Sequence, residues 1–275
     1  CGKKIGPDPR NFNQRVSLGR NDLLIRTFPR FFSMKYYVHM KYILSISMSI
    51  LWLTSSNSLA AISLDRTRVI FNESEKTVVV NINNDNKQLP YLAQAWLEDD
   101  KMNKLTKGPI ALTPPVQRIE PGERSLITLT TTALAKELAA DRESVFYFIL
   151  REIPPKSKKD NVMQIALQTK VKLFYRPKSI ESVAEKDWHK DIKLMYQRKG
   201  YRIINPTPLH LTVIGLAGSG SDIKTNKFEG VMVEPKSELY VESKKFSTPH
   251  LSFINDYGGR PVIQFTCVAD ECSVK

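Results

Sequence analysis

The sequence predicts an all-β protein with two β-sandwich domains, and three observations support this fold class. Segments of alternating or β-branched residues recur throughout residues 61–275, turn residues separate these segments, and helical periodicity is nearly absent. The chain has 275 residues, which is long enough for two domains. Its composition, 41% hydrophobic and 25% charged, is that of a globular protein and excludes wholesale disorder. We therefore expect short antiparallel strands packed in two layers in each domain.

The first domain is predicted to span residues 61–177. Residues 76–83 are rich in β-branched side chains and end in the turn sequence NNDN, and residues 91–97 alternate and include Trp96. Further strands are expected at residues 64–71, 125–130, 144–151 and 163–175. Pro177 ends the last of them, because proline cannot continue a central strand.

The second domain is predicted to span residues 187–275, after a polar and charged hinge at residues 178–186. Its expected strands lie at residues 192–195, 201–205, 210–216, 230–233, 238–241, 251–255 and 262–267. Domains of roughly 115 and 90 residues are of normal size for β-sandwiches.

Residues 34–60 have the three-part anatomy of a secretory signal peptide. Lys35 and Lys41 form a basic start, residues 42–53 are uncharged and mostly apolar, and Ser-Leu-Ala at 58–60 is a cleavage pattern. The apolar run would extend about 18 Å as a helix, too short for a hydrocarbon core of roughly 30 Å. We therefore expect an exported chain with no membrane span after the signal.

Residues 1–33 precede this signal and do not begin with Met. We interpret them as over-called upstream sequence, with the true start at Met34 or Met40. A short disordered basic arm is the alternative.

The net charge of +13 raises the alternative of a nucleic-acid or polyanion binder. Residues 1–60, however, hold nine basic and two acidic residues, so residues 61–275 keep a net charge of only +6. Export and this small excess argue against a nucleic-acid partner. A steep salt dependence of DNA binding by residues 61–275 would revive the idea.

Motifs for catalysis, nucleotide binding or metal binding are not found. The patterns GxSxG, HExxH, GxGxxG and the P-loop do not occur, and His189, His210 and His250 are scattered without ligand-like spacing. We therefore expect neither an enzyme nor a cofactor. Four residues separate Cys267 from Cys272 near the end of an exported chain. This spacing suits a disulfide that closes a terminal hairpin and contributes about 2 kcal/mol.

Three features stand out from this background. Arg66 and Arg68 lie two residues apart in the first predicted strand and would share one face, ordinarily a solvated one. In the strand from residue 163, Met163, Ile165 and Leu167 would point one way, which by itself favours ordinary sandwich core. The third feature is the basic loop PPKSKKDN before that strand, which would ordinarily be a solvated hairpin tip.

Several segments together resemble the periplasmic pilus-assembly chaperones of the chaperone–usher type. The resemblance covers essentially all of residues 61–275. The segments that carry it are LDRTR at 64–68, NNDNKQLPYLAQAW at 83–96, TPPVQR at 113–118, FYFILREIPP at 146–155, QIALQTKVKLFYRP at 164–177, NPTP at 205–208 and INDYGGRP at 254–261.

The resemblance implies two immunoglobulin-like domains joined at an angle, with a cleft between them. Arg68 and Lys172 match the cleft residues of the family that hold the C-terminal carboxylate of a pilus subunit. Each charge-assisted hydrogen bond to such a carboxylate contributes roughly 1.5–3 kcal/mol.

The resemblance also implies that residues 163–172 add a strand to an unfinished sandwich in the subunit, an established case of strand addition. Met163, Ile165 and Leu167 would then fill the subunit's groove instead of the protein's own core. The implied partners are pilus subunits, including an adhesin, and the outer-membrane usher. The implied location is the periplasm, and no ATP is needed. Self-association of the unbound chaperone, which would cover this strand, stays open.

Glu143, Arg176 and Asp256 match an ionic cluster that sets the domain angle in the family, the alternative being three unrelated surface charges. The peptide bond before Pro114 or Pro115 is a candidate cis bond. A secreted structural or adhesive sandwich is the remaining alternative, and self-polymerisation would favour it.

Overall fold

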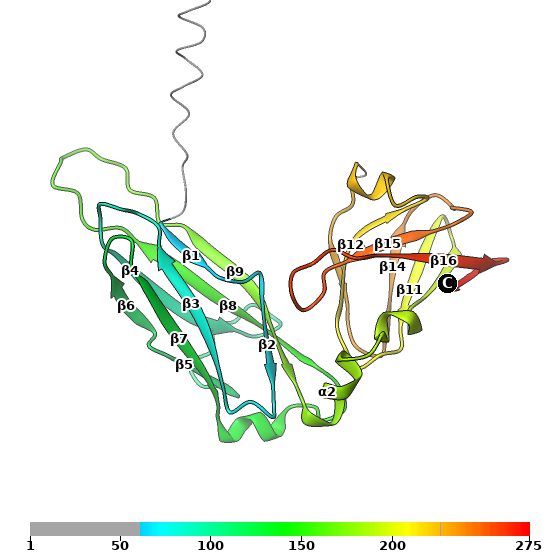
Figure 1. Ribbon diagram of the computed structural model, residues 1–275, viewed down its shortest axis with the longest axis horizontal. Helices are drawn as coiled ribbons and strands as arrows, with labels where there is room; N and C mark the ends of the chain where they lie inside the picture. The colour runs from blue at the N-terminus through cyan, green and yellow to red at the C-terminus, as the bar shows by residue number, and fades with distance from the viewer. Residues whose placement is uncertain (1–60, 226) are drawn as a thin grey trace, which may run out of the picture. The chain divides into compact units, whose positions relative to one another are not determined.

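The computed structural model describes residues 61–225 and 227–275, and within them the chain forms two β-sandwiches (Figure 1). The predicted signal peptide and the segment before it lie outside the described residues. In the first sandwich one sheet has the order β1-β3-β7-β5, made of Ile62–Leu64, Thr77–Asn84, Arg124–Thr131 and Ile110–Thr113. The other has the order β2-β9-β8-β4-β6, made of Arg68–Asn72, Gln168–Arg176, Ser144–Ile153, Tyr91–Glu98 and Val116–Ile119.

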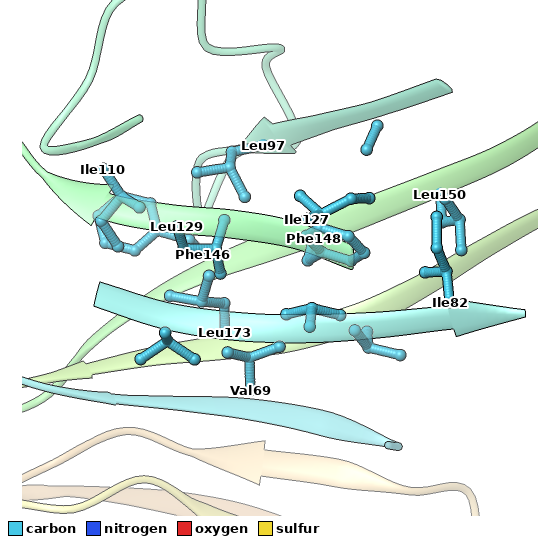
Figure 2. Packing of buried hydrophobic residues seen from close by; sticks show 14 of the residues in the cluster. Val69, Ile82, Leu97, Ile110, Ile127, Leu129, Phe146, Phe148, Leu150 and Leu173 are labelled. Carbon is cyan, nitrogen blue, oxygen red and sulfur yellow. The ribbon is translucent and has the colours of Figure 1, made fainter. Parts of the chain in front are cut away.

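The core of the first sandwich follows from strict alternation along its strands. In β3 the side chains of Val78, Val80 and Ile82 are buried, and those between them face outward. Phe148 of β8 and Ile127 of β7 are fully buried between the two sheets (Figure 2). The predicted all-β class is therefore confirmed, because each sheet has one apolar and one polar face.

The prediction of one long first strand is wrong. The chain forms β1, leaves it at Asp65, and re-enters the opposite sheet as β2 at Arg68. Arg66 lies in the bend between the two strands and pairs with Asp65, whereas Arg68 is buried in β2. The two arginines therefore do not share a strand face, and the switch between sheets explains why simple alternation failed here.

The expected strand at residues 163–175 starts later than predicted. β9 begins at Gln168, which pairs with Arg151 of β8. The segment before it has no ladder partner, apart from the Leu167 carbonyl, which accepts from the Glu152 amide at 3.0 Å. In Figure 1 this segment belongs to the light-green loop that extends past the strand ends. Without a neighbouring strand, an alternating sequence alone does not form a sheet.

One further detail of the first sandwich was not predicted. The pairing of β2 with β9 is parallel, so the sandwich is not entirely antiparallel. Of the two candidate cis bonds, the one before Pro114 is cis, and it lies between the short strands β5 and β6. One 3-10 helix, η1 at Ala133–Glu137, precedes β8.

Residues of the predicted hinge form a helix, α2, at Lys178–Ala184, directly after Pro177. A second 3-10 helix, η2 at Trp188–Asp191, leads into the second sandwich. Within the described residues, no helix is both long and apolar enough to cross a membrane.

The second sandwich is closed by a strand shared between its layers. Residues Val262–Val268 form β16, whose first half pairs with β15 and whose second half pairs with β17. The full strand order is β13-β12-β15-β16-β17-β10-β11-β14. In that order the strands are Val231–Val233, Leu211–Ala217, His250–Phe253, Val262–Val268, Glu271–Val274, Lys193–Gln197, Gly200–Asn205 and Ser237–Glu242, and the helix η3 covers Asp222–Lys224.

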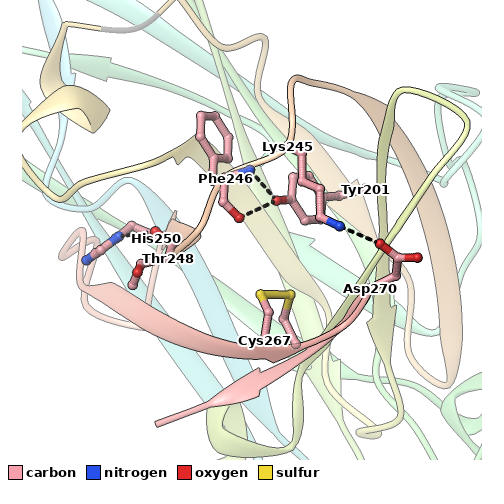
Figure 3. Close-up of a disulfide and its surroundings, with 8 residues drawn as sticks. Tyr201, Lys245, Phe246, Thr248, His250, Cys267 and Asp270 are labelled. Atoms are coloured by element: carbon pink, nitrogen blue, oxygen red, sulfur yellow. Dashed lines mark hydrogen bonds and ion pairs between the residues drawn. A yellow bond between two sulfur atoms is a disulfide. The ribbon is translucent and has the colours of Figure 1, made fainter.

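The predicted disulfide joins Cys267 of β16 to Cys272 of β17 (Figure 3). The two cysteines are direct cross-strand partners, so the bond closes the terminal hairpin. Around it, Lys245 pairs with Asp270 at 2.7 Å, and the Tyr201 hydroxyl accepts from the Phe246 amide at 2.9 Å.

Candidate functional site

Two cations stand side by side at the start of the parallel strand pair. Arg68 of β2 is the register partner of Lys172 of β9. Their neighbours Val69 and Leu173, also register partners, are buried in the sandwich core. Because side chains alternate along a strand, both cations must point away from that core, on the outer face of the sheet.

The second sandwich covers both cations and supplies polar partners, though no acid pairs with them. The Arg68 Nη1 donates to the Ile254 carbonyl at 3.0 Å, and the Lys172 Nζ donates to the Thr212 hydroxyl at 3.4 Å. Arg68 is only 7% exposed, its guanidinium lies 5.6 Å from the centre of the Phe174 ring, and its Nε is buried without a partner. Across the described residues neither cation forms a salt bridge.

The electrostatics of this pair favour an anion. Burial lowers the pKa of Lys172, and the neighbouring charge of Arg68 lowers it further. Burial also lowers the pKa of Arg68, against the opposing effect of Asp256 and Glu143. Two adjacent, partly desolvated cations repel each other, so an anion with two acceptor oxygens, such as a carboxylate, would neutralise both.

An open pocket of about 830 Å³ extends from Arg68 along the edge of β2. It is lined by β2, by α2 and by the loop between β15 and β16. The pocket therefore leaves room next to Arg68 for side chains of a ligand that the cation pair holds.

The predicted ionic cluster is brought together across the two sandwiches. Arg176 of β9 donates to Glu143 at 2.7 and 3.0 Å and to Asp256 at 3.0 Å. The side chains of Arg176 and Glu143 are almost fully buried, whereas that of Asp256 is 38% exposed. A buried pair of this kind fixes geometry more than it adds stability.

Sequence reasoning missed a fourth member of this cluster, His210. Its backbone amide donates to Glu143 at 2.7 Å, and its Nδ1 lies 3.2 Å from the same carboxylate oxygen. Burial by itself would raise the pKa of Glu143, but the hydrogen bonds from His210 and the charge of Arg176 lower it overall. A single histidine without ligand-like spacing gave no sequence signal, and only the fold places it here.

The predicted donor residues are exposed. Met163, Ile165 and Leu167 are 87%, 67% and 46% exposed, although all three are strongly apolar. If the segment continued β9, these residues would lie on the same face as Val171 and Leu173, which are buried in the core. The segment before β9 therefore presents exposed apolar side chains that could form one face of a strand beyond the end of the protein's own sheet.

Comparisons with known proteins identify the family of the chain. Residues 61–181 match the family described as pili and flagellar-assembly chaperone, PapD N-terminal domain, and residues 187–265 match the pili assembly chaperone PapD, C-terminal domain. The chain is 56% identical to chaperone protein PapD of Escherichia coli, over 78% of this chain and 90% of that protein. It is 41% identical to the probable fimbrial chaperone YfcS of Escherichia coli K12, over 80% and 88% of the two chains.

Solved structures show the same fold. The periplasmic chaperone SfaE superposes with a TM-score of 0.60 at 28% identity, covering 74% of this chain and 96% of that one. The CupB2 chaperone of Pseudomonas aeruginosa gives 0.61 at 27% identity, covering 74% and 98%. Because both domain families match and together cover most of the described residues, the chain belongs to the pilus-assembly chaperones, which are binding proteins and not enzymes.

Proposed function

We propose that this protein is a periplasmic chaperone that binds, folds and caps pilus subunits by donor-strand complementation. One observation carries the mechanism: an exposed, alternating apolar segment leads directly into β9, where Lys172 lies opposite Arg68 in a cation pair that has no acidic partner. The segment supplies a strand to an unfinished subunit, and the cations hold the end of that subunit's chain.

The cation pair would fix the register of the added strand. Arg68 and Lys172 bind the C-terminal carboxylate of the subunit, so the preceding residues run along the open edge next to β9. A slip by one residue would turn every side chain to the wrong face. With the end anchored, Met163, Ile165 and Leu167 meet the groove of the subunit, each contributing roughly 1.5–3 kcal/mol when fully buried.

The ionic cluster serves this site by holding the two sandwiches together. Ile254 and Thr212, which contact the cations, belong to the second sandwich, whereas the cations belong to the first. Glu143, Arg176 and Asp256 fix this relationship and thereby the shape of the anchor. No nucleotide is required, because burial of apolar surface and the carboxylate bonds drive capping.

Delivery to the outer-membrane usher completes the proposed role. Location in the periplasm follows from the predicted signal and agrees with the periplasmic chaperone SfaE, a structural relative. Pilins and tip adhesins are the expected cargo. A chain in a solved structure of the Salmonella enterica SafA pilin in complex with the SafB chaperone shares this fold.

Co-expression with a pilin and isolation of a one-to-one complex from the periplasm tests the proposal. The wild-type protein should yield the complex. A protein carrying both Arg68→Ala and Lys172→Ala should yield folded chaperone but no stable complex. Normal capping by this double variant would disprove the anchor, and normal capping by a Met163→Ser, Ile165→Ser, Leu167→Ser variant would disprove the donor segment.

A further inference from the structure

We infer that Tyr257 is a specificity-determining contact for the last residues of the bound subunit, and that it receives a neutral apolar or aromatic side chain beside the carboxylate anchor. This inference rests on the proposed function and adds to it a residue and a sequence preference. It starts from the exposure of Tyr257, which at 96% exceeds that of every donor residue. An exposed aromatic side chain is a typical centre of binding energy when a partner covers it.

The loop that carries Tyr257 is held rigidly by its own hydrogen bonds. The Asn255 Oδ1 accepts from the backbone amides of Tyr257 and Gly259, at 3.2 and 2.7 Å. The Asn255 amide donates to the Gly259 carbonyl, and the Gly258 amide donates to the Asn255 carbonyl, both at 3.0 Å. Little conformational entropy remains to be lost when a partner binds to such a loop.

Three contacts fix this loop against the first sandwich, next to the anchor. The Ile254 carbonyl accepts from Arg68, and Asp256 pairs with Arg176. Gly258 has a φ of +79°, and a Cβ at this position would lie 2.6 Å from the Thr67 hydroxyl, so only glycine allows the loop to come this close. Tyr257 therefore has a set position relative to the cation pair.

Tyr257 and Arg68 line the same pocket of about 830 Å³. Several of the charges in its lining are already satisfied. Arg66 pairs with Asp65 at 2.8 Å, and Glu181 accepts from the Ser74 amide at 2.9 Å. These groups would gain little from a charged ligand side chain.

The rest of the lining selects against acidic residues. Glu75 and Glu185 also line the pocket, whereas Ile70, Ala184 and the Tyr257 ring provide apolar surface. An acidic side chain would be repelled by the two glutamates, and an apolar or aromatic one would bury its surface against the ring. The occupant is therefore a neutral side chain close to the subunit's terminal carboxylate.

Binding of a synthetic peptide with the C-terminal strand sequence of a pilin, measured by calorimetry on the full protein, tests the inference. Tyr257→Ala should weaken binding about tenfold, as for the loss of a moderate binding hot spot. Tyr257→Phe should keep the wild-type affinity, because the ring makes the contact. Val268→Ala is the matched control, since Val268 is 80% exposed on β16 and does not line the pocket.

An amidated version of the same peptide separates this inference from the proposed function. If amidation weakens binding to the wild-type protein and Tyr257→Ala does not, the anchor stands and the role of Tyr257 is disproved. If amidation changes nothing, the carboxylate anchor itself fails, and the inference fails with it. A peptide with Asp at the position next to its end should bind more weakly than one with Phe there, and the opposite order would contradict the pocket assignment. Thermal unfolding of Tyr257→Ala should match the wild type, because so exposed a side chain adds little to stability.

Discussion

Arg68 lies directly opposite Lys172 in the parallel pairing of β2 with β9, and no carboxylate of the described residues pairs with either. Proteins rarely keep two neighbouring cations partly buried without an acid, because desolvation and mutual repulsion both disfavour the charges. In the unbound protein the two charges interact unfavourably, and a bound anion would remove this repulsion. We therefore expect the site to lower the stability of the unbound protein, as functional sites often do.

Replacement of Lys172 by Met should stabilise the unbound protein. The variant removes a partly desolvated charge next to Arg68 and leaves an unbranched apolar chain in its place, so the free energy of unfolding should rise by up to about 1 kcal/mol. Urea unfolding measures this change. Lys170→Met is the matched control two residues earlier on the same face. Lys170 pairs with Glu98 at 2.7 Å, so its loss should leave stability unchanged or lower it slightly. A clear loss of stability in Lys172→Met would contradict the expected repulsion between the two charges.

Binding of the subunit's carboxylate should weaken at a lower alkaline pH than it would if Lys172 had the pKa of an ordinary lysine. The pKa of Lys172 is lowered by burial and by Arg68, so in the unbound protein Lys172 loses its proton below the usual value of 10.5. Binding to an anion favours the protonated form, and affinity should therefore be constant at neutral pH and fall as the pH rises through this lowered pKa. Titration of the free-carboxylate peptide from pH 7 upward measures the effect. The Lys172→Met variant should bind more weakly and lack this pH-dependent fall, and a fall of equal size in the variant would assign it to another group.

Polar substitutions in the donor segment should abolish capping and leave the fold unaffected. Met163→Ser and Ile165→Ser remove side chains that are 87% and 67% exposed, so the free energy of unfolding should stay within about 0.5 kcal/mol of the wild type. Subunit complexes should nevertheless be lost, because these side chains are buried only in the partner. Leu150→Ser in β8 is the contrasting variant, since Leu150 is 2% exposed and its loss should destabilise the protein itself. Destabilisation by Met163→Ser comparable to that by Leu150→Ser would show that the segment packs in the protein's own core.

The sequence predicted those parts of the fold that local alternation determines. The strands around Val80 and Phe148 are regular, and their buried faces follow directly from the period of two. The switch between sheets at Arg66 was missed, because a bend between two short strands and a single strand have the same residue pattern. The exposure of Met163 could not be predicted from alternation either. A strand face has the same residue pattern whether the protein's own sheet or a partner covers it.

Some residues of the site were predicted from the sequence, whereas others were not. Arg68 and Lys172 were singled out through the family resemblance, and their register pairing is a property of the folded sheet alone. His210 was overlooked because its two contacts with Glu143 join residues 67 positions apart, one in each sandwich. Contacts of this kind depend on how the domains meet, which no local pattern records.

Loss of the Glu143 carboxylate should destabilise the junction between the sandwiches far more than loss of Asp256. Glu143→Gln leaves the buried Arg176 without the negative charge of its closest partner, and breaking a buried ion pair costs about 3 kcal/mol or more. Asp256→Asn removes a partner that is 38% exposed and should cost no more than about 1 kcal/mol. The pKa of Glu143 is lower in the folded protein than its usual value of 4.5, so its stabilising effect is complete above that pH and is lost as the pH falls through the lowered value. The difference between wild type and Glu143→Gln in urea unfolding should therefore be constant from pH 6 to 8 and shrink below about pH 4.5. A difference that persists unchanged at pH 3 would mean that Glu143 acts through packing and not through its charge.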